Sequence, residues 1–181
     1  MLILQNFVSE EYQNYLESLV TSSQFPLFFN KDTALGEGSL INNNVISAPQ
    51  FTHTFIVGKK PNSDFCGLLD EIIKNMEKQT DLTSGLTIER VKLNLNTQHQ
   101  KTLSTSYYAP HVDVTNAKGV TGVYYVSNSD GDTLFFSEGK ITNRVTPKKG
   151  TMILFDNKVF HSGQPPKKSK YRCLINFNWV V

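Results

Sequence analysis

The sequence is poor in cysteine and has no long apolar run. Its two cysteines, Cys66 and Cys173, lie far apart and neither belongs to a C-x-x-C pair, which excludes a zinc knuckle and a thioredoxin-type redox site. No apolar stretch reaches membrane-spanning length. The first residues, 1–5, lack the basic start and the length of a signal peptide. We therefore expect a soluble, cytoplasmic protein with free thiols and no membrane partner.

The chain also lacks a marked excess of charge. Charged residues make up 19% of the sequence and the formal net charge is +2, which is too small to indicate a nucleic-acid partner. The basic cluster of Lys167, Lys168 and Lys170 follows two prolines and is typical of a solvated turn. Apolar residues reach 39%, including 12 Phe, which can build a core. A length of 181 residues then predicts a single domain, 1–181.

The first half of the chain is predicted to contain two helices and one strand. Residues 9–21 begin with Ser9 as a plausible N-cap and continue with apolar residues at helical spacing. Residues 30–50 are rich in Gly and Asn, show no period and indicate a long loop, which in a compact domain is often functional. Residues 51–57 alternate as a strand does. The second helix begins near Ser63 and has one apolar stripe: Phe65, Leu68, Leu69, Ile72 and Met76.

From residue 87 onward only strands are predicted. Many short strands separated by turn signals are typical of a sandwich or barrel, and no helix alternates with them as in a doubly wound sheet. The fold class is therefore mainly β with flanking N-terminal helices. Residues 1–87 supply helical and strand support, and residues 88–181 form the β core with the site. The predicted strands are 91–96, 120–127, 133–136, 142–146, 151–155 and 171–181.

Two histidines and one aspartate form a candidate metal site. In an extended segment residues i and i+2 point the same way, so His111 and Asp113 can reach a common ion. His161 follows after three or four predicted strands, and an antiparallel sandwich can return it to their side. Two His and one carboxylate on one face of a metal leave positions open opposite, which suits non-haem Fe(II). His53, in a strand, and His99, in a polar loop, are not expected to bind metal, although His99 is a candidate substrate contact.

Arg172 is a candidate anchor for an anionic ligand. It opens the last apolar strand, and a cation that enters a core strand needs an anionic partner. The planar fork of Arg binds a carboxylate with two hydrogen bonds. A dicarboxylate cosubstrate would be such a partner, and a structural ion pair with an Asp or Glu is the alternative.

Four motifs follow one another in the chain: His111-Val112-Asp113, Asp130-Gly131-Asp132-Thr133-Leu134-Phe135, His161 and Arg172. This ordered set resembles the Fe(II)- and 2-oxoglutarate-dependent oxygenases, especially the prolyl-4-hydroxylase-like branch and its short phage-encoded members. The resemblance covers roughly residues 88–181. It implies a distorted double-stranded β-helix, a jelly-roll or cupin-like fold, with the metal at one open end. A phage-encoded protein of this kind would work in the cytoplasm of the host cell.

The resemblance also assigns roles and cofactors. The three predicted ligands would bind Fe(II), and Arg172 would bind the distal carboxylate of 2-oxoglutarate. Tyr125 matches a tyrosine that touches the same carboxylate, although a plain strand aromatic explains it equally well. Tyr108 matches a tyrosine that faces the substrate, whereas Tyr107 is expected to pack. The cofactors implied are Fe(II), 2-oxoglutarate and O₂.

Several positions depart from the pattern of the relatives. Asn178 stands where related prolyl hydroxylases of transcription factors have Trp, and period 2 places Trp179 on the opposite face. Asn176 shares the face of Asn178, so the pocket wall is polar and both are candidate substrate contacts, which puts a prolyl substrate in doubt. A tyrosine upstream of H-x-D is not evident, and Asn94 or Asn96 could hold the cosubstrate in its place.

The sequence therefore predicts a dioxygenase that hydroxylates a protein, peptide or small molecule, with release of succinate and CO₂. A prolyl residue is one substrate option, and a small molecule or another side chain is the alternative. A metal-binding jelly roll without turnover and a cupin-like zinc site remain open, but neither needs a cation at Arg172. Residues 30–50 and 97–109 are predicted to form the loops that choose the substrate. The oligomeric state stays open.

Overall fold

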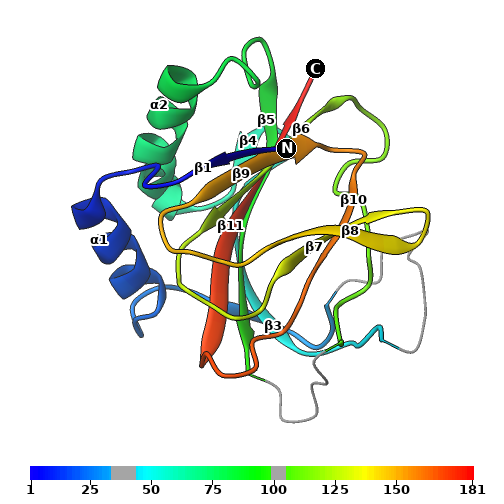
Figure 1. Cartoon of the computed structure of the whole chain (residues 1–181). Helices are drawn as coiled ribbons and strands as arrows, with labels where there is room; N and C mark the ends of the chain where they lie inside the picture. Colours follow the sequence, from blue (N-terminus) through cyan, green and yellow to red (C-terminus); the bar gives the residue numbers. More distant parts are fainter. Residues whose placement is uncertain (34–43, 99–104) are drawn as a thin grey trace.

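Two antiparallel β-sheets of unequal size build the fold (Figure 1). The computed structural model describes residues 1–33, 44–98 and 105–181. The larger sheet has eight strands in the order β1-β9-β6-β11-β5-β3-β2, with β4 paired to β3, and the smaller has three in the order β10-β7-β8. This mostly β, antiparallel arrangement, with two α-helices among the described residues, confirms the predicted jelly-roll-like fold class.

The elements follow the chain in an order that places both helices before the site-bearing strands. They are β1 (Leu2–Leu4), α1 (Glu10–Val20), β2 (Phe28–Asn30), β3 (Gln50–Val57), β4 (Lys60–Pro61), the 3₁₀ helix η1 (Asp64–Leu69), α2 (Asp70–Gln79), β5 (Thr87–Thr97), β6 (Gly119–Tyr125), β7 (Thr133–Ser137), β8 (Lys140–Val145), β9 (Met152–Asp156), β10 (Phe160–Gly163) and β11 (Tyr171–Val180).

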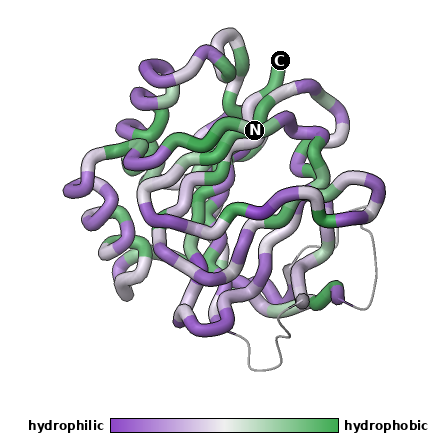
Figure 2. The backbone as a smooth tube through the Cα atoms, in the orientation of Figure 1, coloured by the Kyte–Doolittle hydropathy of each residue, from purple (hydrophilic) through white to green (hydrophobic). Residues whose placement is uncertain are grey.

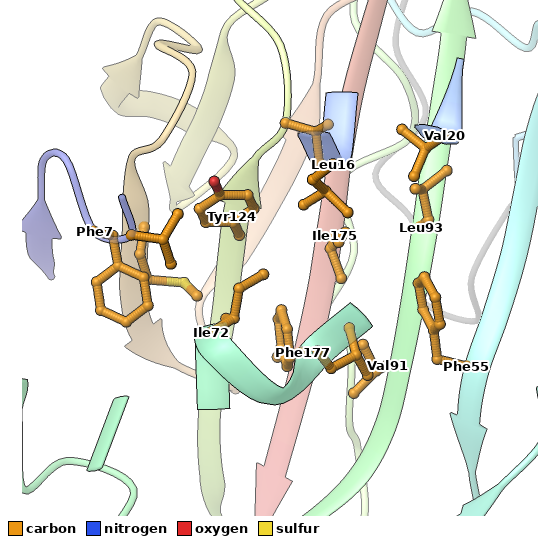
Figure 3. Close-up of a cluster of buried hydrophobic side chains, with 14 of the residues drawn as sticks. Phe7, Leu16, Val20, Phe55, Ile72, Val91, Leu93, Tyr124, Ile175 and Phe177 are labelled. Atoms are coloured by element: carbon orange, nitrogen blue, oxygen red, sulfur yellow. The ribbon is translucent and has the colours of Figure 1, made fainter. Parts of the chain in front are cut away.

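The two helices lie on one side of the large sheet, and the small sheet lies on the other (Figure 1). Leu16 of α1 and Ile72 of α2 are fully buried and belong to the same apolar cluster as Ile175 and Phe177 of β11 (Figure 3). Burying one such side chain contributes about 1.5–3 kcal/mol. The stripe predicted for the second helix therefore packs against the sheet, as expected. The helices carry both hydrophilic and hydrophobic segments, as elements with one buried face do (Figure 2).

Alternation along β5 and β11 divides the molecule into an apolar side and a polar side. Val91 and Leu93 of β5 face the helices, and the residues that alternate with them along the strand face the small sheet. On β11, Trp179 lies in the apolar cluster and stacks on Phe177 with ring centroids 5.2 Å apart. Asn178 points away from that cluster and contacts Asp113. The two faces predicted for the last strand are therefore confirmed.

Some elements differ from the sequence-based expectation. The second helix was predicted as one helix, but it begins as the 3₁₀ helix η1 and becomes α-helical at Asp70. Gly67 lies in this first part, and glycine disfavours a regular α-helix. Ser63 does cap the segment, because its hydroxyl accepts from the N–H of Phe65 at 3.0 Å. The short strands β1, β2, β4 and β10 were missed, since each is too brief to show a period.

The structure describes only parts of the two loops that are predicted to select the substrate. Residues 34–43 and 99–104, which include His99, lie outside the described residues. In the flanking parts, Val45 forms a bridge with Tyr107, and Tyr107 packs against Leu134 and Phe136. The packing role predicted for Tyr107 is confirmed. In the part of the chain that is described, no helix is long and apolar enough to cross a membrane.

Candidate active site

Strand pairing brings the two distant histidines of the predicted metal site together. His161 lies on β10 and forms an antiparallel bridge with His111, in which each N–H donates to the other's carbonyl oxygen at 3.0 Å. Their ring centroids are 4.8 Å apart. Asp113 follows two residues after His111. The ligand atoms of all three residues lie within 4.8 Å of one another, so the group could hold a metal ion.

Backbone contacts orient both imidazoles toward the aspartate. Nδ1 of His111 lies 3.0 Å from the carbonyl oxygen of Ala109, and Nδ1 of His161 lies 3.1 Å from that of Val159. Because a carbonyl only accepts hydrogen bonds, each Nδ1 donates to that oxygen, and each Nε2 is left on the side of the aspartate. The two Nε2 atoms lie 3.8 Å and 3.5 Å from the Asp113 carboxylate. Burial lowers the pKa of His161, which favours the neutral, ligating form.

Three side chains from the central strands hold the Asp113 carboxylate. Arg90 of β5 donates to Oδ1 at 3.1 Å, and the amides of Asn176 and Asn178 of β11 donate to Oδ2 at 2.9 Å and 3.1 Å. Burial alone would raise the pKa of Asp113, but the two histidines, Arg90 and the Asn176 amide hold that pKa below its usual range. A buried, ionised carboxylate beside two imidazoles is a good donor set for a divalent cation such as Fe(II).

Arg172 is buried and has no carboxylate partner among the described residues. Its side chain is enclosed at 4% exposure. Nε donates to the carbonyl oxygen of Gly131 at 2.8 Å and Nη2 donates to the hydroxyl of Thr133 at 2.7 Å. Both acceptors are neutral, so the guanidinium is fixed in place without an ion pair in the described residues; burial lowers the pKa of Arg172, and the charge of Asp132 is among the effects that oppose this. Nη1 and the second hydrogen of Nη2 remain free of a protein acceptor in the described residues.

A hydrogen bond to Thr133 connects Tyr125 with Arg172. The Tyr125 hydroxyl donates to the Thr133 hydroxyl at 2.7 Å, and Tyr125 itself is fully buried and does not line the cavity described below. Gly163 of β10 leaves room for the guanidinium, because a Cβ there would lie 3.1 Å from Nη1 of Arg172. Tyr125 and Gly163 therefore both help to position the arginine.

Two further polar groups near Arg172 have no hydrogen-bond partner in the described part of the protein. They are the hydroxyl of Tyr108 and the Nδ2 of Asn96, both buried. Burial raises the pKa of Tyr108 to about 12, against the opposing effects of the Arg172 charge and the neighbouring Asn96 amide. Tyr108 is therefore a neutral donor at physiological pH. Buried donors without acceptors are costly, which indicates that a polar ligand completes them.

One cavity of about 280 Å³ connects the histidine–aspartate group with Arg172. Tyr125 and Asn178 do not line it, and Asn178 instead hydrogen-bonds Asp113. In the structure, both Asn176 and Asn178 hydrogen-bond Asp113. The substrate contacts suggested for these two residues remain predictions. The predicted site residues that line the cavity are Asn94, Asn96, Tyr108, His111, Asp113, His161, Arg172 and Asn176.

Sequence reasoning missed four residues of this site: Arg90, Lys92, Thr133 and Gly163. A signal for the first two was present, since they share the period-2 polar face of β5 with Asn94 and Asn96. Thr133 stands in one of the motifs that carry the family resemblance, but no pattern indicated its contact with Arg172, and no local pattern marks Gly163.

His53, Cys66 and Cys173 lie outside this cavity. Nδ1 of His53 lies 2.8 Å from the Pro26 carbonyl oxygen, and its Nε2 lies 2.7 Å from the Ser63 hydroxyl. Cys66 and Cys173 are free thiols.

Comparison with known proteins agrees with the geometry. A mainly β, antiparallel fold that gathers two histidines and an aspartate at one cavity is typical of non-haem iron enzymes. Residues 97–180 match the profile of the 2OG-Fe(II) oxygenase superfamily. This stretch therefore carries a 2OG-Fe(II) oxygenase domain, of a superfamily of dioxygenases that uses Fe(II), 2-oxoglutarate and O₂. No curated protein matches the sequence.

Solved structures with low sequence identity share the fold. An oxidoreductase of the 2OG-Fe(II) oxygenase family from Burkholderia pseudomallei has a TM-score of 0.71 at 12% identity, over 99% of this chain and 84% of that chain. The viral collagen prolyl hydroxylase of Paramecium Bursaria Chlorella virus-1, in its 2OG complex, has a TM-score of 0.61 at 17% identity, over 99% and 96%. A non-haem alpha-ketoglutarate-dependent epimerase from nogalamycin biosynthesis has a TM-score of 0.62 at 14% identity, over 99% and 76%.

Proposed function

We propose that this oxygenase hydroxylates its substrate at an Fe(II) ion held by His111, Asp113 and His161, with the distal carboxylate of 2-oxoglutarate anchored at Arg172. The observation that carries the proposal is the presence of a buried guanidinium, without an ion pair among the described residues, in the same cavity as the His-Asp-His group. A zinc-binding cupin or a metal site without turnover gives no reason for that cation. A dicarboxylate cosubstrate does, because it needs a cation at the end remote from the metal.

The residues present fit both cofactors. Two imidazoles and one carboxylate are the donor set that suits Fe(II), and the buried donor groups of Tyr108 and Asn96 lie beside Arg172, where they could donate to anionic oxygens of a ligand. When bound, Fe(II), 2-oxoglutarate and O₂ supply an oxidative decarboxylation that is coupled to hydroxylation of the substrate and releases succinate and CO₂.

The chain's own contribution to the reaction is position and a partly desolvated cavity. The carbonyl oxygens of Ala109 and Val159 fix the tautomers of the two histidines, and Arg90, Asn176 and Asn178 keep Asp113 ionised and aimed at them. Such supporting contacts typically change metal affinity or activity by about 10–100-fold when removed.

At the end of the cavity remote from the metal site, hydrogen bonds to Thr133 and Gly131 fix the guanidinium of Arg172 in the absence of a ligand. We propose that Tyr125 acts there as a positioning residue through Thr133, and that Asn96 takes the role of the missing upstream tyrosine. Asn94 lies two residues before Asn96 on β5 and also lines the cavity. It is proposed as a weaker contact with the cosubstrate.

The substrate proposed is a peptide side chain, with a prolyl residue as one option. The fold shared with a viral collagen prolyl hydroxylase supports a peptide, and the fold shared with the nogalamycin-pathway epimerase supports a small molecule. Asn176, at the wall of the cavity, makes that wall polar. A polar wall favours a substrate with hydrogen-bonding groups beside the reacting carbon.

Two broader features are proposed with this function. Residues 1–181 form one domain, which is supported by an apolar cluster shared between the helices of the first half and β5 and β11 of the second. A reducing compartment such as the cytoplasm is supported by the free thiols of Cys66 and Cys173.

Substitution of the proposed ligands tests the function. His111→Ala, Asp113→Ala and His161→Ala should each abolish Fe(II)- and 2-oxoglutarate-dependent succinate formation, while the circular dichroism spectrum keeps its native form. His53→Ala, which removes a histidine outside the cavity, is the matched control and should retain succinate formation. Full turnover by the His161→Ala protein would sink the assignment.

A further inference from the structure

Among the described residues that line the cavity, cations outnumber carboxylates. Arg90, Lys92 and Arg172 carry positive charge, whereas Asp113 is the one carboxylate. In the proposed complex the two charges of Fe(II) and the two of 2-oxoglutarate are opposite and cancel. An excess of about two positive charges therefore remains beside the reaction centre, and it is a property of this chain's own residues.

Lys92 is the one of these three cations to which no anionic partner has been assigned. Arg90 is paired with Asp113 at 3.1 Å, and Arg172 is assigned to 2-oxoglutarate. Within residues 1–33, 44–98 and 105–181, Lys92 forms no ion pair and no hydrogen bond, although it is only partly exposed. Burial, and next the charge of Arg90, lower the pKa of Lys92, and the charge of Asp113 opposes them only in part. A lysine in this situation gains from an anion that binds next to it.

The position of Lys92 indicates the end of the cavity at which such an anion would bind. On β5 it pairs with Asn176 of β11, whose amide nitrogen donates to Asp113 at 2.9 Å, so Lys92 lies at the metal end of the cavity. Arg172 lies four residues away along β11, a separation of about 13 Å at the rise of a strand. The carboxylate of 2-oxoglutarate that pairs with Arg172 is therefore too far away to neutralise Lys92, and the charge of its other carboxylate is already offset by Fe(II) in the count above.

A second polar group at the same place is also incomplete. Oδ1 of Asn176 is buried and has no hydrogen-bond partner in the described part of the chain. It faces the same cavity as Lys92 from the neighbouring strand. An ammonium drawn in by a bound anion, or a donor on the ligand itself, would satisfy this oxygen.

We propose that the substrate of this oxygenase carries an anionic group, a carboxylate or a phosphate, which Lys92 binds beside the metal site with Arg90 as the flanking cation. The inference rests on the proposed function, because it assumes that 2-oxoglutarate occupies the Arg172 end. It narrows the substrate from any peptide or small molecule to one with a negative charge close to the carbon that reacts.

Matched probes that differ by one charged group test this inference. Zinc-loaded protein saturated with 2-oxoglutarate, which binds without turnover, is titrated calorimetrically with N-acetyl-aspartate N-methylamide and with its asparagine counterpart. A second pair, N-acetyl-phosphoserine N-methylamide and its serine counterpart, separates phosphate from carboxylate. A hydrogen-bonded ion pair to Lys92 should make one anionic probe bind about tenfold or more tightly than its neutral counterpart.

Three variants assign the preference to one side chain. Lys92→Met should bring the anionic and neutral probes to equal affinity, and Lys92→Arg should retain most of the difference. Lys60→Met, on the exposed strand β4 outside the cavity, is the matched control and should behave as the parent.

Several outcomes would overturn the inference. They are equal binding of both members of each pair, no binding of any probe, or an anion preference that persists in Lys92→Met. A loss of 2-oxoglutarate affinity in Lys92→Met would overturn it as well, because Lys92 would then serve the cosubstrate. Failure of the parent to bind 2-oxoglutarate or to form succinate with Fe(II) would instead refute the proposed function, and the two failures are therefore distinguishable.

Discussion

Replacement of Arg172 separates an oxygenase from a protein that only binds metal. The guanidinium is 4% exposed, and two hydrogen bonds of 2.8 Å and 2.7 Å to neutral acceptors fix its orientation. A ligand carboxylate therefore meets a desolvated cation that loses little conformational entropy on binding. We expect Arg172→Ala to weaken 2-oxoglutarate binding strongly and Arg172→Lys to weaken it less.

The magnitude follows from the burial of the pair. Removing one partner of a buried, hydrogen-bonded charge pair costs about 2–5 kcal/mol. This corresponds to a fall in 2-oxoglutarate affinity of about thirtyfold or more. A lysine keeps a point charge but cannot donate to Gly131, Thr133 and the ligand with one planar fork, so Arg172→Lys should give an intermediate affinity.

Calorimetric titration of 2-oxoglutarate into metal-loaded protein measures the effect directly. Arg144→Ala removes an arginine whose side chain is 62% exposed and serves as the matched control, with an affinity close to that of the parent. The affinity for the metal in the absence of cosubstrate should change little in Arg172→Ala, because the arginine lies at the other end of the cavity. Parental 2-oxoglutarate affinity in both Arg172 variants would refute the assigned role and leave the cation purely structural.

Two further predictions concern the support of this anchor and of the fold. Gly163→Ala places a Cβ 3.1 Å from Nη1 of Arg172, and since overpacking costs about 1–3 kcal/mol, 2-oxoglutarate affinity should fall several-fold in calorimetry, whereas Gly67→Ala, with open space around it, should not change it. Ile72→Ala removes a fully buried side chain and should lower the free energy of unfolding in urea by about 2–5 kcal/mol, with 2-oxoglutarate affinity retained; an unchanged midpoint would contradict the packing of α2.

Part of the fold could be predicted because apolar and polar residues alternate strictly in the middle of β5. Val91, Leu93 and Leu95 of β5 are spaced by two residues, which predicts a strand and the face that it buries. The ligand spacing of His111 and Asp113 was also visible, since it depends only on strand geometry. Both are local properties, and local periodicity is what a single sequence records.

Contacts between distant segments could not be predicted in the same way. The bridge of His111 with His161, inside a strand of only four residues, depends on the return of β10 to the site. The ion pair of Arg90 with Asp113 and the clearance that Gly163 gives to Arg172 likewise join residues far apart in the chain. No periodicity encodes such pairs, because they form only when the sheets are assembled.

The support of Asp113 links the chemistry of the site to the stability of the core. Its three donors, Arg90, Asn176 and Asn178, stand on β5 and β11, whose opposite faces pack against α1 and α2. The carboxylate is therefore held in its ionised, oriented form by strands that are themselves fixed by apolar packing, before any metal binds. A site that is formed in advance on rigid strands loses little free energy to reorganisation when the ion arrives. No residue of α1 or α2 lines the cavity. The two helices nevertheless help to position Asp113, because they pack against the strands that carry its three hydrogen-bond donors.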